Sequence, residues 1–304
     1  MNKKTVPASL PPHLLIFGAG YSALPFGAQM VVRGWRVSAT IRAGTPPQKL
    51  VDAGIAPLIF GESSLPTDIS HIVVSVPPNA KGNHTEGAID AVLATYGAAI
   101  RALTGLKWIA YLSSTNVYGD HGGQWVTETT KPAPTLARGI RRLAAEAAWQ
   151  KLAHRCGAAL YILRLAGIYG PGRNAVRSLL DGTARRIIKK GQVFSRIHRD
   201  DICRALSLAA TADPIGPGPC HIFNLADDTP CPPQDIVAAA AKLLNMPAPP
   251  PIAFELADIS PMAKSFYSEN KRVKNTKIKT ELGLELMYPG YMSALRDLVK
   301  YELA

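Results

Sequence analysis

The sequence predicts an α/β protein: a doubly wound parallel sheet with a smaller α/β subdomain toward the C-terminus. Three observations support this fold class. Short, almost continuously apolar segments alternate with helical patterns through the first half of the chain, as in parallel sheets that helices cover on both faces. A glycine-rich turn joins the first apolar segment to the first helical one. Beyond residue 173 the alternation is less regular, with proline-rich joints at 213–220 and 246–251.

The elements follow in order along the chain. HLLIF at 13–17 is an apolar strand, a helical stretch continues to Arg33, and WRVSATI at 35–41 has strand composition, which makes one β-α-β unit. Later strands are expected at 56–60, 71–78, 107–115 and 158–170. Helices are expected across 85–102 and over the segment that contains TLARGIRRLAAE (135–146). The helix at RDDICRAL and the strand at HIFNL should return to the sheet.

Composition limits the classes of protein to consider. The 304 residues are 47% hydrophobic and can bury a full core, and a formal net charge of +12 favours anionic ligands. The cysteines, at 156, 203, 220 and 231, show no C-x-x-C spacing and no neighbouring His cluster, so we expect reduced thiols, no metal site and a cytoplasmic protein. The sequence shows no secretion signal near its start and no long apolar run that would indicate a membrane span.

The first β-α turn, GAGYSA at 18–23, fits the dinucleotide-binding pattern G-x-G-x-x-A. In that pattern the first glycine makes a tight turn, the second lets the backbone approach a pyrophosphate, and the small third residue permits close helix packing. The helix N-terminus then faces the phosphates. The alternative is a tight turn that binds nothing. Because the motif lies inside a β-α-β unit, we expect a Rossmann-type dinucleotide site.

Arg42 stands at the end of the second strand, where a site that prefers NAD carries an acidic residue. A guanidinium can donate two parallel hydrogen bonds to a 2′-phosphate, whereas a carboxylate would repel it. NADP is therefore the expected cofactor, with NAD as the alternative. A surface arginine at a strand end is the competing interpretation.

Several later segments resemble the extended, epimerase/dehydratase-like branch of the short-chain dehydrogenase/reductases. They are YLSSTNVYGD (111–120), RLAGIYGPGR (164–173), RIHRDDICRAL (196–206) and FNLADDTPCPPQDIV (223–237), in family order. The resemblance implies a Rossmann-type domain at 13–172, completed by about 198–226. The substrate-side subdomain would comprise about 173–197 and 227–304, and residues 1–12 would be a flexible tail.

The resemblance also shows a departure. The family's acid/base chemistry usually rests on a Y-x-x-x-K pair, with a Glu four residues beyond the Lys. Alignment on Glu146 puts Arg142 at the Lys position and Arg138 at the Tyr position. Arginine stays protonated and exchanges no proton in a reaction. Arg142 could still hold the cofactor ribose and Arg138 an anionic substrate group, unless the pair is only a solvated basic face.

The expected site residues follow from these motifs. Ser114 matches the family's catalytic Ser/Thr, and a replacement proton donor is sought among Tyr118, Tyr169 and His198, although a structural role suits His198 better. The catalytic candidates are Ser114, Tyr118 and Tyr169; the cofactor-binding candidates are Gly18, Gly20, Tyr21, Ser22, Ala23, Arg42, Val76, Pro77, Arg142 and Gly167; the substrate-binding candidates are Arg138, Arg173 and His198.

Three functional hypotheses remain open at this point. The first is an NADP-dependent oxidoreductase or epimerase-like enzyme acting on a small anionic or sugar-type metabolite. A homodimer is one arrangement considered for this enzyme. The second is a non-catalytic dinucleotide-binding sensor or interaction protein. The third is nucleic-acid binding through the basic run at 268–284, which is disfavoured because the run lacks the interleaved aromatic residues of single-strand binders.

Overall fold

A parallel sheet of seven strands, in the order β11-β7-β5-β4-β1-β2-β3, forms the centre of the molecule. The computed structural model describes residues 10–78, 90–212 and 220–304, so most of the expected N-terminal tail and the start of the helix expected at 85–102 lie outside the described residues. The sheet strands are β1 (His13–Phe17), β2 (Arg36–Ile41), β3 (Ala56–Ile59), β4 (His71–Val74), β5 (Trp108–Ser114), β7 (Ala159–Leu165) and β11 (Cys220–Leu225). This arrangement confirms the expected fold class.

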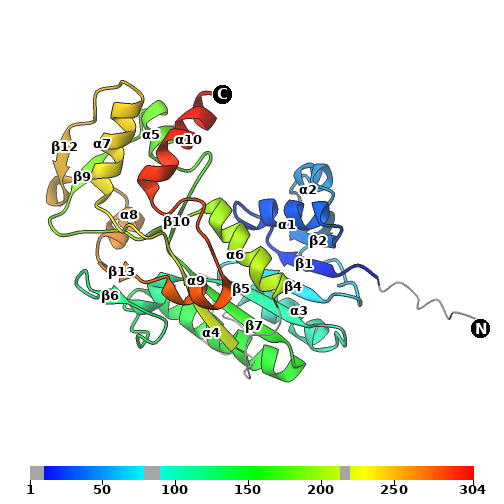
Figure 1. Cartoon of the computed structure of the whole chain (residues 1–304). Coiled ribbons are helices and arrows are strands. Elements are labelled where there is room, and N and C mark those ends of the chain that lie inside the picture. Colours follow the sequence, from blue (N-terminus) through cyan, green and yellow to red (C-terminus); the bar gives the residue numbers. More distant parts are fainter. Residues whose placement is uncertain (1–9, 79–89, 213–219) are drawn as a thin grey trace, which may run out of the picture.

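Helices cover both faces of this sheet (Figure 1). One face packs on α1 (Ala23–Val32) and α6 (Arg199–Thr211), and the other packs on α3 (Ala91–Arg101) and α4 (Ala137–Cys156). A short helix, α2 (Gln48–Asp52), precedes β3. The strand order reverses between β1 and β4, and the glycine-rich turn follows β1 at the carboxyl edge of the sheet, as expected for a doubly wound fold.

The expected strand at 158–170 is two strands in the structure. β7 ends at Leu165, and β8 (Gly167–Tyr169) pairs with β10 (Arg196–His198) in a separate two-stranded sheet. The break has a hydrogen-bonding cause: the Ala166 N–H still donates to Leu225 of the main sheet, whereas the Gly167 N–H donates to Ser195. The chain thus leaves the sheet at its carboxyl edge and enters the subdomain.

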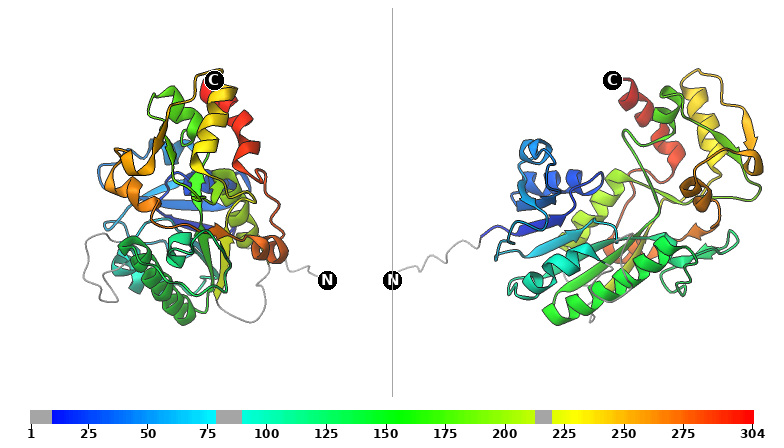
Figure 2. Two further views of the ribbon diagram at one scale, coloured as in Figure 1. Left: turned by 90° about the vertical axis from the view of Figure 1, so that its left-hand side faces the viewer. Right: turned by 180° about the vertical axis from the view of Figure 1, so that it is seen from behind.

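The C-terminal subdomain stands at that edge (Figure 2). The remaining elements outside the main sheet, in the subdomain and beside it, are η1 (Thr115–Tyr118), β6 (Trp125–Val126), α5 (Ala175–Leu180), β9 (Arg186–Ile188), α7 (Pro233–Leu243), β12 (Pro251–Ala253), η2 (Phe254–Leu256), α8 (Pro261–Phe266), β13 (Arg272–Val273), α9 (Thr276–Leu282) and α10 (Tyr291–Leu303). Helices α5, α7 and α10 share a small core of their own. Helix α9 instead packs on β11 and α6, so this part of 227–304 joins the core of the main sheet.

A buried ion pair fixes α4 on the sheet. Glu146 of α4 accepts from Arg164 of β7 through both carboxylate oxygens, at 3.1 Å from Nε and 2.7 Å from Nη2, and each residue is 3% exposed. Ser113 of β5 donates to the same carboxylate at 2.5 Å. Arg164 also donates to Tyr118, whose hydroxyl donates to Asn224 of β11. This network joins one helix to three neighbouring strands.

We expect Glu146→Gln to lower the free energy of unfolding by about 3 to 5 kcal/mol, because it leaves the Arg164 charge buried without its partner. Arg164→Met should cost a similar amount. The double variant should cost less than the sum of the two, since it removes both charges together. Urea unfolding measures all three, and Glu255→Gln, an exposed carboxylate of η2, is the control. Strict additivity of the two single changes would contradict the coupling.

Candidate functional site

The turn after β1 has the shape that a pyrophosphate requires. Gly18 has φ +82°, which favours glycine, and the space beside Gly20 is open to 4 Å around the position of a Cβ atom. Ser22 caps α1 without a side-chain hydrogen bond to the first turn, while Ala23 is fully buried beneath it. Backbone N–H groups at a helix N-terminus attract anions. The residues present therefore fit a dinucleotide phosphate.

Tyr21, in the same turn, ties the loop to the subdomain. Its hydroxyl donates to the Pro171 carbonyl at 2.9 Å, and its ring lies under the guanidinium groups of Arg173, at 5.9 Å, and Arg199, at 5.3 Å. Two cations beside this ring put positive charge next to the phosphate-binding turn. An anion at the turn would therefore meet cations as well as backbone N–H groups.

The other candidates for the cofactor lie along the same edge. Arg42 follows β2 and is exposed, and within residues 10–78, 90–212 and 220–304 its guanidinium has no hydrogen bond or ion pair. Val76 and Pro77 follow β4, and Val76 packs against Gly18. Gly167 begins β8 and lines the cavity described next. These positions all lie at or just beyond the carboxyl ends of sheet strands, namely β2, β4 and β7.

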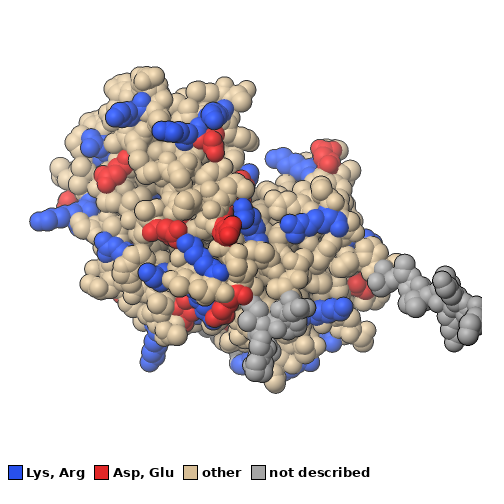
Figure 3. Space-filling view, viewed as in Figure 1, with Lys and Arg blue, Asp and Glu red and all other residues tan. Residues whose placement is uncertain are grey.

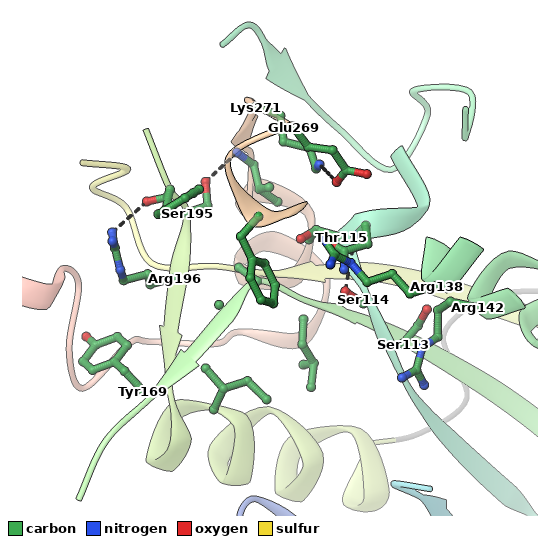
Figure 4. Close-up of a pocket in the computed structure, with 18 of the residues that line it drawn as sticks. Ser113, Ser114, Thr115, Arg138, Arg142, Tyr169, Ser195, Arg196, Glu269 and Lys271 are labelled. Carbon is green, nitrogen blue, oxygen red and sulfur yellow. Dashed lines mark hydrogen bonds and ion pairs between the residues drawn. The ribbon is translucent and has the colours of Figure 1, made fainter. Parts of the chain in front are cut away.

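A cavity of about 570 Å³ opens between the carboxyl edge of the sheet and the subdomain (Figure 4). The strand ends supply Ser114 and Tyr169, α4 supplies Arg138 and Arg142, and Ser22 lines the end nearest the glycine-rich turn. Other polar residues of the lining are Ser75, Ser113, Thr115, Asn116, Arg173, Ser195, Arg196, Tyr267, Glu269 and Lys271. Five of the lining side chains are Arg or Lys and one is acidic, so the described lining favours an anionic ligand.

The three catalytic candidates are not brought together. Ser114 lines the cavity, and its hydroxyl oxygen accepts from the Asn116 N–H at 3.2 Å, which leaves its own proton available to a ligand. Tyr169 also lines it, but the hydroxyl is buried and has no hydrogen-bond partner among the described residues, and burial raises its pKa. Tyr118 lies outside the lining, fully buried between Asn224 and Arg164. Tyr118 therefore contributes no hydroxyl group to the cavity lining.

His198 caps a helix in this structure. Its Nδ1 accepts from the Asp200 N–H at 3.2 Å at the start of α6, and its ring packs between Tyr169 and Tyr288. Burial lowers the pKa of His198 to about 4, so the ring is neutral near pH 7. It is not part of the cavity lining, which differs from the expected contact with substrate and fits the structural alternative. Arg173, by contrast, does line the cavity.

Arg142 and Arg138 both face the cavity from α4 rather than forming a solvated basic face. Arg142 donates to the Tyr111 hydroxyl at 3.1 Å and to the Leu112 carbonyl at 3.0 Å, which holds its charge beside the end of β5. Arg138 reaches α8, where it donates to the hydroxyl and the carbonyl of Ser265 and lies 4.4 Å over the ring of Phe266. Arg138 thus bridges the sheet domain and the subdomain across the cavity.

Sequence reasoning missed an acid and a base in the cavity wall. Glu269 and Lys271 are 5% and 8% exposed, and the Lys271 Nζ donates to Glu269 Oε2 at 2.7 Å and to the Gly119 carbonyl at 2.6 Å. Burial lowers the pKa of Lys271. The available signal was their i, i+2 spacing, which puts both side chains on one side of an extended segment.

Neither a membrane-spanning helix nor a cluster of metal ligands is found in the part of the chain that the structure describes. No helix there is long and apolar enough to span a bilayer. Nor do three or more His, Cys, Asp or Glu side chains of that part gather where they could hold a metal ion. On the face shown in Figure 3, Lys and Arg side chains are scattered among Asp and Glu.

Known proteins resemble this chain over most of its length. A protein from Silicibacter pomeroyi, described as functionally unknown and conserved, is 43% identical, with a TM-score of 0.85, 94% of this chain covered and 98% of that one. Protein YeeZ of Escherichia coli is 28% identical over 285 residues, which are 90% of this chain and 95% of YeeZ.

More distant solved structures share the fold. MoeE5 in complex with UDP-glucuronic acid and NAD has a TM-score of 0.72 at 20% identity, with 96% of this chain and 99% of that chain covered. A dTDP-glucose 4,6-dehydratase from Bacillus anthracis, in complex with NAD, has a TM-score of 0.74 at 15% identity, with 96% of each chain covered. Residues 83–226 match the model of the NAD dependent epimerase/dehydratase family. This match, the nucleotide turn and the sheet order together show that the chain is similar to the NAD dependent epimerase/dehydratase family.

Proposed function

We propose that the protein is an NADP-dependent oxidoreductase or epimerase-like enzyme that acts on a small anionic, sugar-type metabolite. One observation carries the proposal: a single cavity runs from Ser22, beside the nucleotide turn, to the cation-rich wall of the subdomain. A hydride donor and a substrate must share one enclosed space, and this cavity adjoins both binding surfaces. The complexes of MoeE5 with UDP-glucuronic acid and NAD support this class of substrate.

The residues have separate roles in this proposal. A bound nicotinamide dinucleotide supplies hydride transfer. The N–H groups at the start of α1 bind its pyrophosphate, Arg42 binds the 2′-phosphate, and Arg142 holds a positive charge near the ribose. Ser114 donates its proton in a hydrogen bond to the substrate oxygen. Arg173 and Arg138 attract the substrate's negative charge, although the contacts of Arg138 with Ser265 also keep α8 over the cavity.

The second candidate is a dinucleotide-binding protein that performs no catalysis. It is favoured by the replacement of both the Tyr and the Lys of the family pair by arginines that are hydrogen-bonded to the protein itself. Turnover separates the two candidates. D-glucuronate, UDP-glucuronic acid and UDP-glucose, each with NADP or NADPH, form the test panel, with glucose as the uncharged comparison. Cofactor absorbance reports hydride transfer, and product analysis reports epimerisation. Tight cofactor binding without any turnover across wider panels of anionic sugars would favour the second candidate.

The first prediction concerns the choice of cofactor. Arg42→Asp should narrow or reverse a preference for NADP(H) over NAD(H), because it replaces a phosphate-binding cation by a carboxylate that suits the free ribose hydroxyls. The lost contact is worth about 1.5 to 3 kcal/mol, or roughly 10- to 150-fold in affinity. Calorimetric titration of both cofactors measures it. Arg33→Asp makes the same charge change before β2, at the opposite edge of the sheet, and should leave the preference unchanged.

A parent protein that binds NAD(H) as tightly as NADP(H) would contradict the assignment of Arg42. So would an equal loss of NADPH affinity in Arg33→Asp and Arg42→Asp, which would indicate a general effect of net charge.

The second prediction separates the two arginines of α4. Arg142→Ala should weaken NADPH binding about tenfold or more, since it removes a cation held at the cofactor end of the cavity. Arg138→Ala should leave NADPH affinity within about twofold, lower any turnover, and speed amide hydrogen exchange in α8, because α8 loses its tie to α4. Arg141→Ala on the same helix is the control, since Arg141 is not part of the cavity lining. NADPH affinities of all three variants equal to the parent's would remove Arg142 from the cofactor site.

A further inference from the structure

The arginines at the Tyr and Lys positions leave open which group exchanges protons with the substrate. A reaction that moves hydride to or from an alcohol carbon must also move the hydroxyl proton. Arginine does not release its proton in a reaction, and Ser114 has a proton but no adjacent base among its contacts with the described residues. A group that can both take and return a proton must come from elsewhere in the lining.

Glu269 is the acidic side chain in the described lining of the cavity. One of its carboxylate oxygens, Oε2, accepts from Lys271, whereas Oε1 is buried and has no hydrogen-bond partner among the described residues. A buried acceptor without a partner costs about 1 to 3 kcal/mol, so it indicates a group that a ligand completes. A substrate hydroxyl has the donor that Oε1 lacks.

Lys271 and Arg138 set the charge around this carboxylate. Lys271 uses two of its three N–H donors on Glu269 and on the Gly119 carbonyl. Arg138 acts electrostatically on both members of the pair, and Figure 4 shows the three side chains on one side of the cavity with Thr115 and Ser114 nearby. The positive charges of both side chains therefore lie beside the carboxylate of Glu269.

The backbone holds this pair firmly. Asn270, between Glu269 and Lys271, accepts from the N–H groups of His121 and Gly123 at 3.0 and 2.9 Å, and its own N–H donates to Asp120 at 2.7 Å. β13 then pairs with β6. The segment at 269–273 is therefore attached to the part of the chain that follows β5 and Ser114. An acid/base group must be held in a fixed position relative to the substrate, and this attachment fixes Glu269 relative to the end of β5.

Resting on the function proposed above, we propose that Glu269 and Lys271 form the proton-exchanging pair of this cavity, with Glu269 Oε1 as the atom that takes the substrate's hydroxyl proton. In the oxidative direction, the substrate C–H bond breaks and its electron pair leaves as hydride for the oxidised nicotinamide. The O–H bond breaks, its proton passes to Glu269, and its electron pair forms the C=O bond. The reductive direction reverses each transfer. Lys271 holds the carboxylate in position through its hydrogen bond to Oε2.

The experiment compares Glu269→Gln and Lys271→Met with two controls outside the cavity lining, Glu255→Gln and Lys274→Met. Turnover is measured with D-glucuronate and the other members of the panel, and NADPH affinity is measured by fluorescence titration. We expect Glu269→Gln to lower kcat about 100-fold or more while NADPH affinity stays within about twofold. Lys271→Met should also lower kcat, though by less than Glu269→Gln, since it removes the hydrogen bond that holds Glu269 Oε2 in place. The controls should behave like the parent.

Turnover in Glu269→Gln within about twofold of the parent, with the same pH dependence, would overturn the pair while leaving the proposed function intact. A parent that binds no NADPH, or turns over no sugar, counts against the proposed function itself.

An NMR titration with 13C at the lysine Cε then decides the pair independently of turnover. The Lys271 signal, assigned by its loss in Lys271→Met, should titrate below the ordinary lysine value of about 10.4 and lower still in Glu269→Gln. A Lys271 signal that titrates at the ordinary value in both proteins overturns the proposal. Urea unfolding of each variant separates a local effect from loss of the fold.

Discussion

The ion pair between Glu146 and Arg164 is the constraint on which the geometry of the cavity depends. Burial of two charges costs free energy unless their hydrogen bonds are complete. Here Ser113 donates a further hydrogen bond to Glu146, and Tyr118 accepts one from Arg164. Since Arg164 belongs to β7 and Ser113 immediately precedes Ser114 at the end of β5, the pair fixes α4 against those strand ends. The directions of Arg138 and Arg142 into the cavity follow from that position of the helix.

The cavity's charge is carried mostly by groups that do not titrate near neutral pH. Arg138, Arg142, Arg173 and Arg196 supply four guanidinium groups to the lining, and a guanidinium carries its charge at any physiological pH. Attraction of an anion is then nearly independent of pH, whereas proton exchange is confined to the few remaining ionisable side chains. In the function proposed for this cavity, the binding of an anion and the exchange of protons therefore belong to different residues.

The fold could be predicted from the sequence because its signals are local. Alternating apolar strands, helices and a glycine-rich turn are set by near neighbours in the chain, and β1 through α1 and β2 formed where the pattern indicated. The division of 158–170 into β7 and β8 could not be predicted, because it depends on Leu225 and Ser195, which supply the acceptors on the two sides of the break.

The site was only partly predictable for the same reason. The resemblance indicated Ser114 and Arg142, and both line the cavity. Tyr118 shares its segment with Ser114, but its hydroxyl pairs with Asn224, which is 106 residues away in the sequence. Ser265, the partner of Arg138, is 127 residues away. Glu269 and Lys271 belong to a basic run whose charges suggested a surface. The sequence pattern of the run at 268–284 gives no sign that two of its residues line a cavity.

The contacts of Arg138 determine what a tyrosine at the same position would change. A tyrosine at that position would bring a group that can titrate, but a phenol on α4 lacks the forked donors that now grip Ser265 and the charge that lies over Phe266. One side chain at this position therefore cannot both supply a titrating phenol and keep the hydrogen bonds that attach α4 to α8. A tyrosine at position 138 would add a titratable group and at the same time loosen the hold of α4 on α8 beside the cavity.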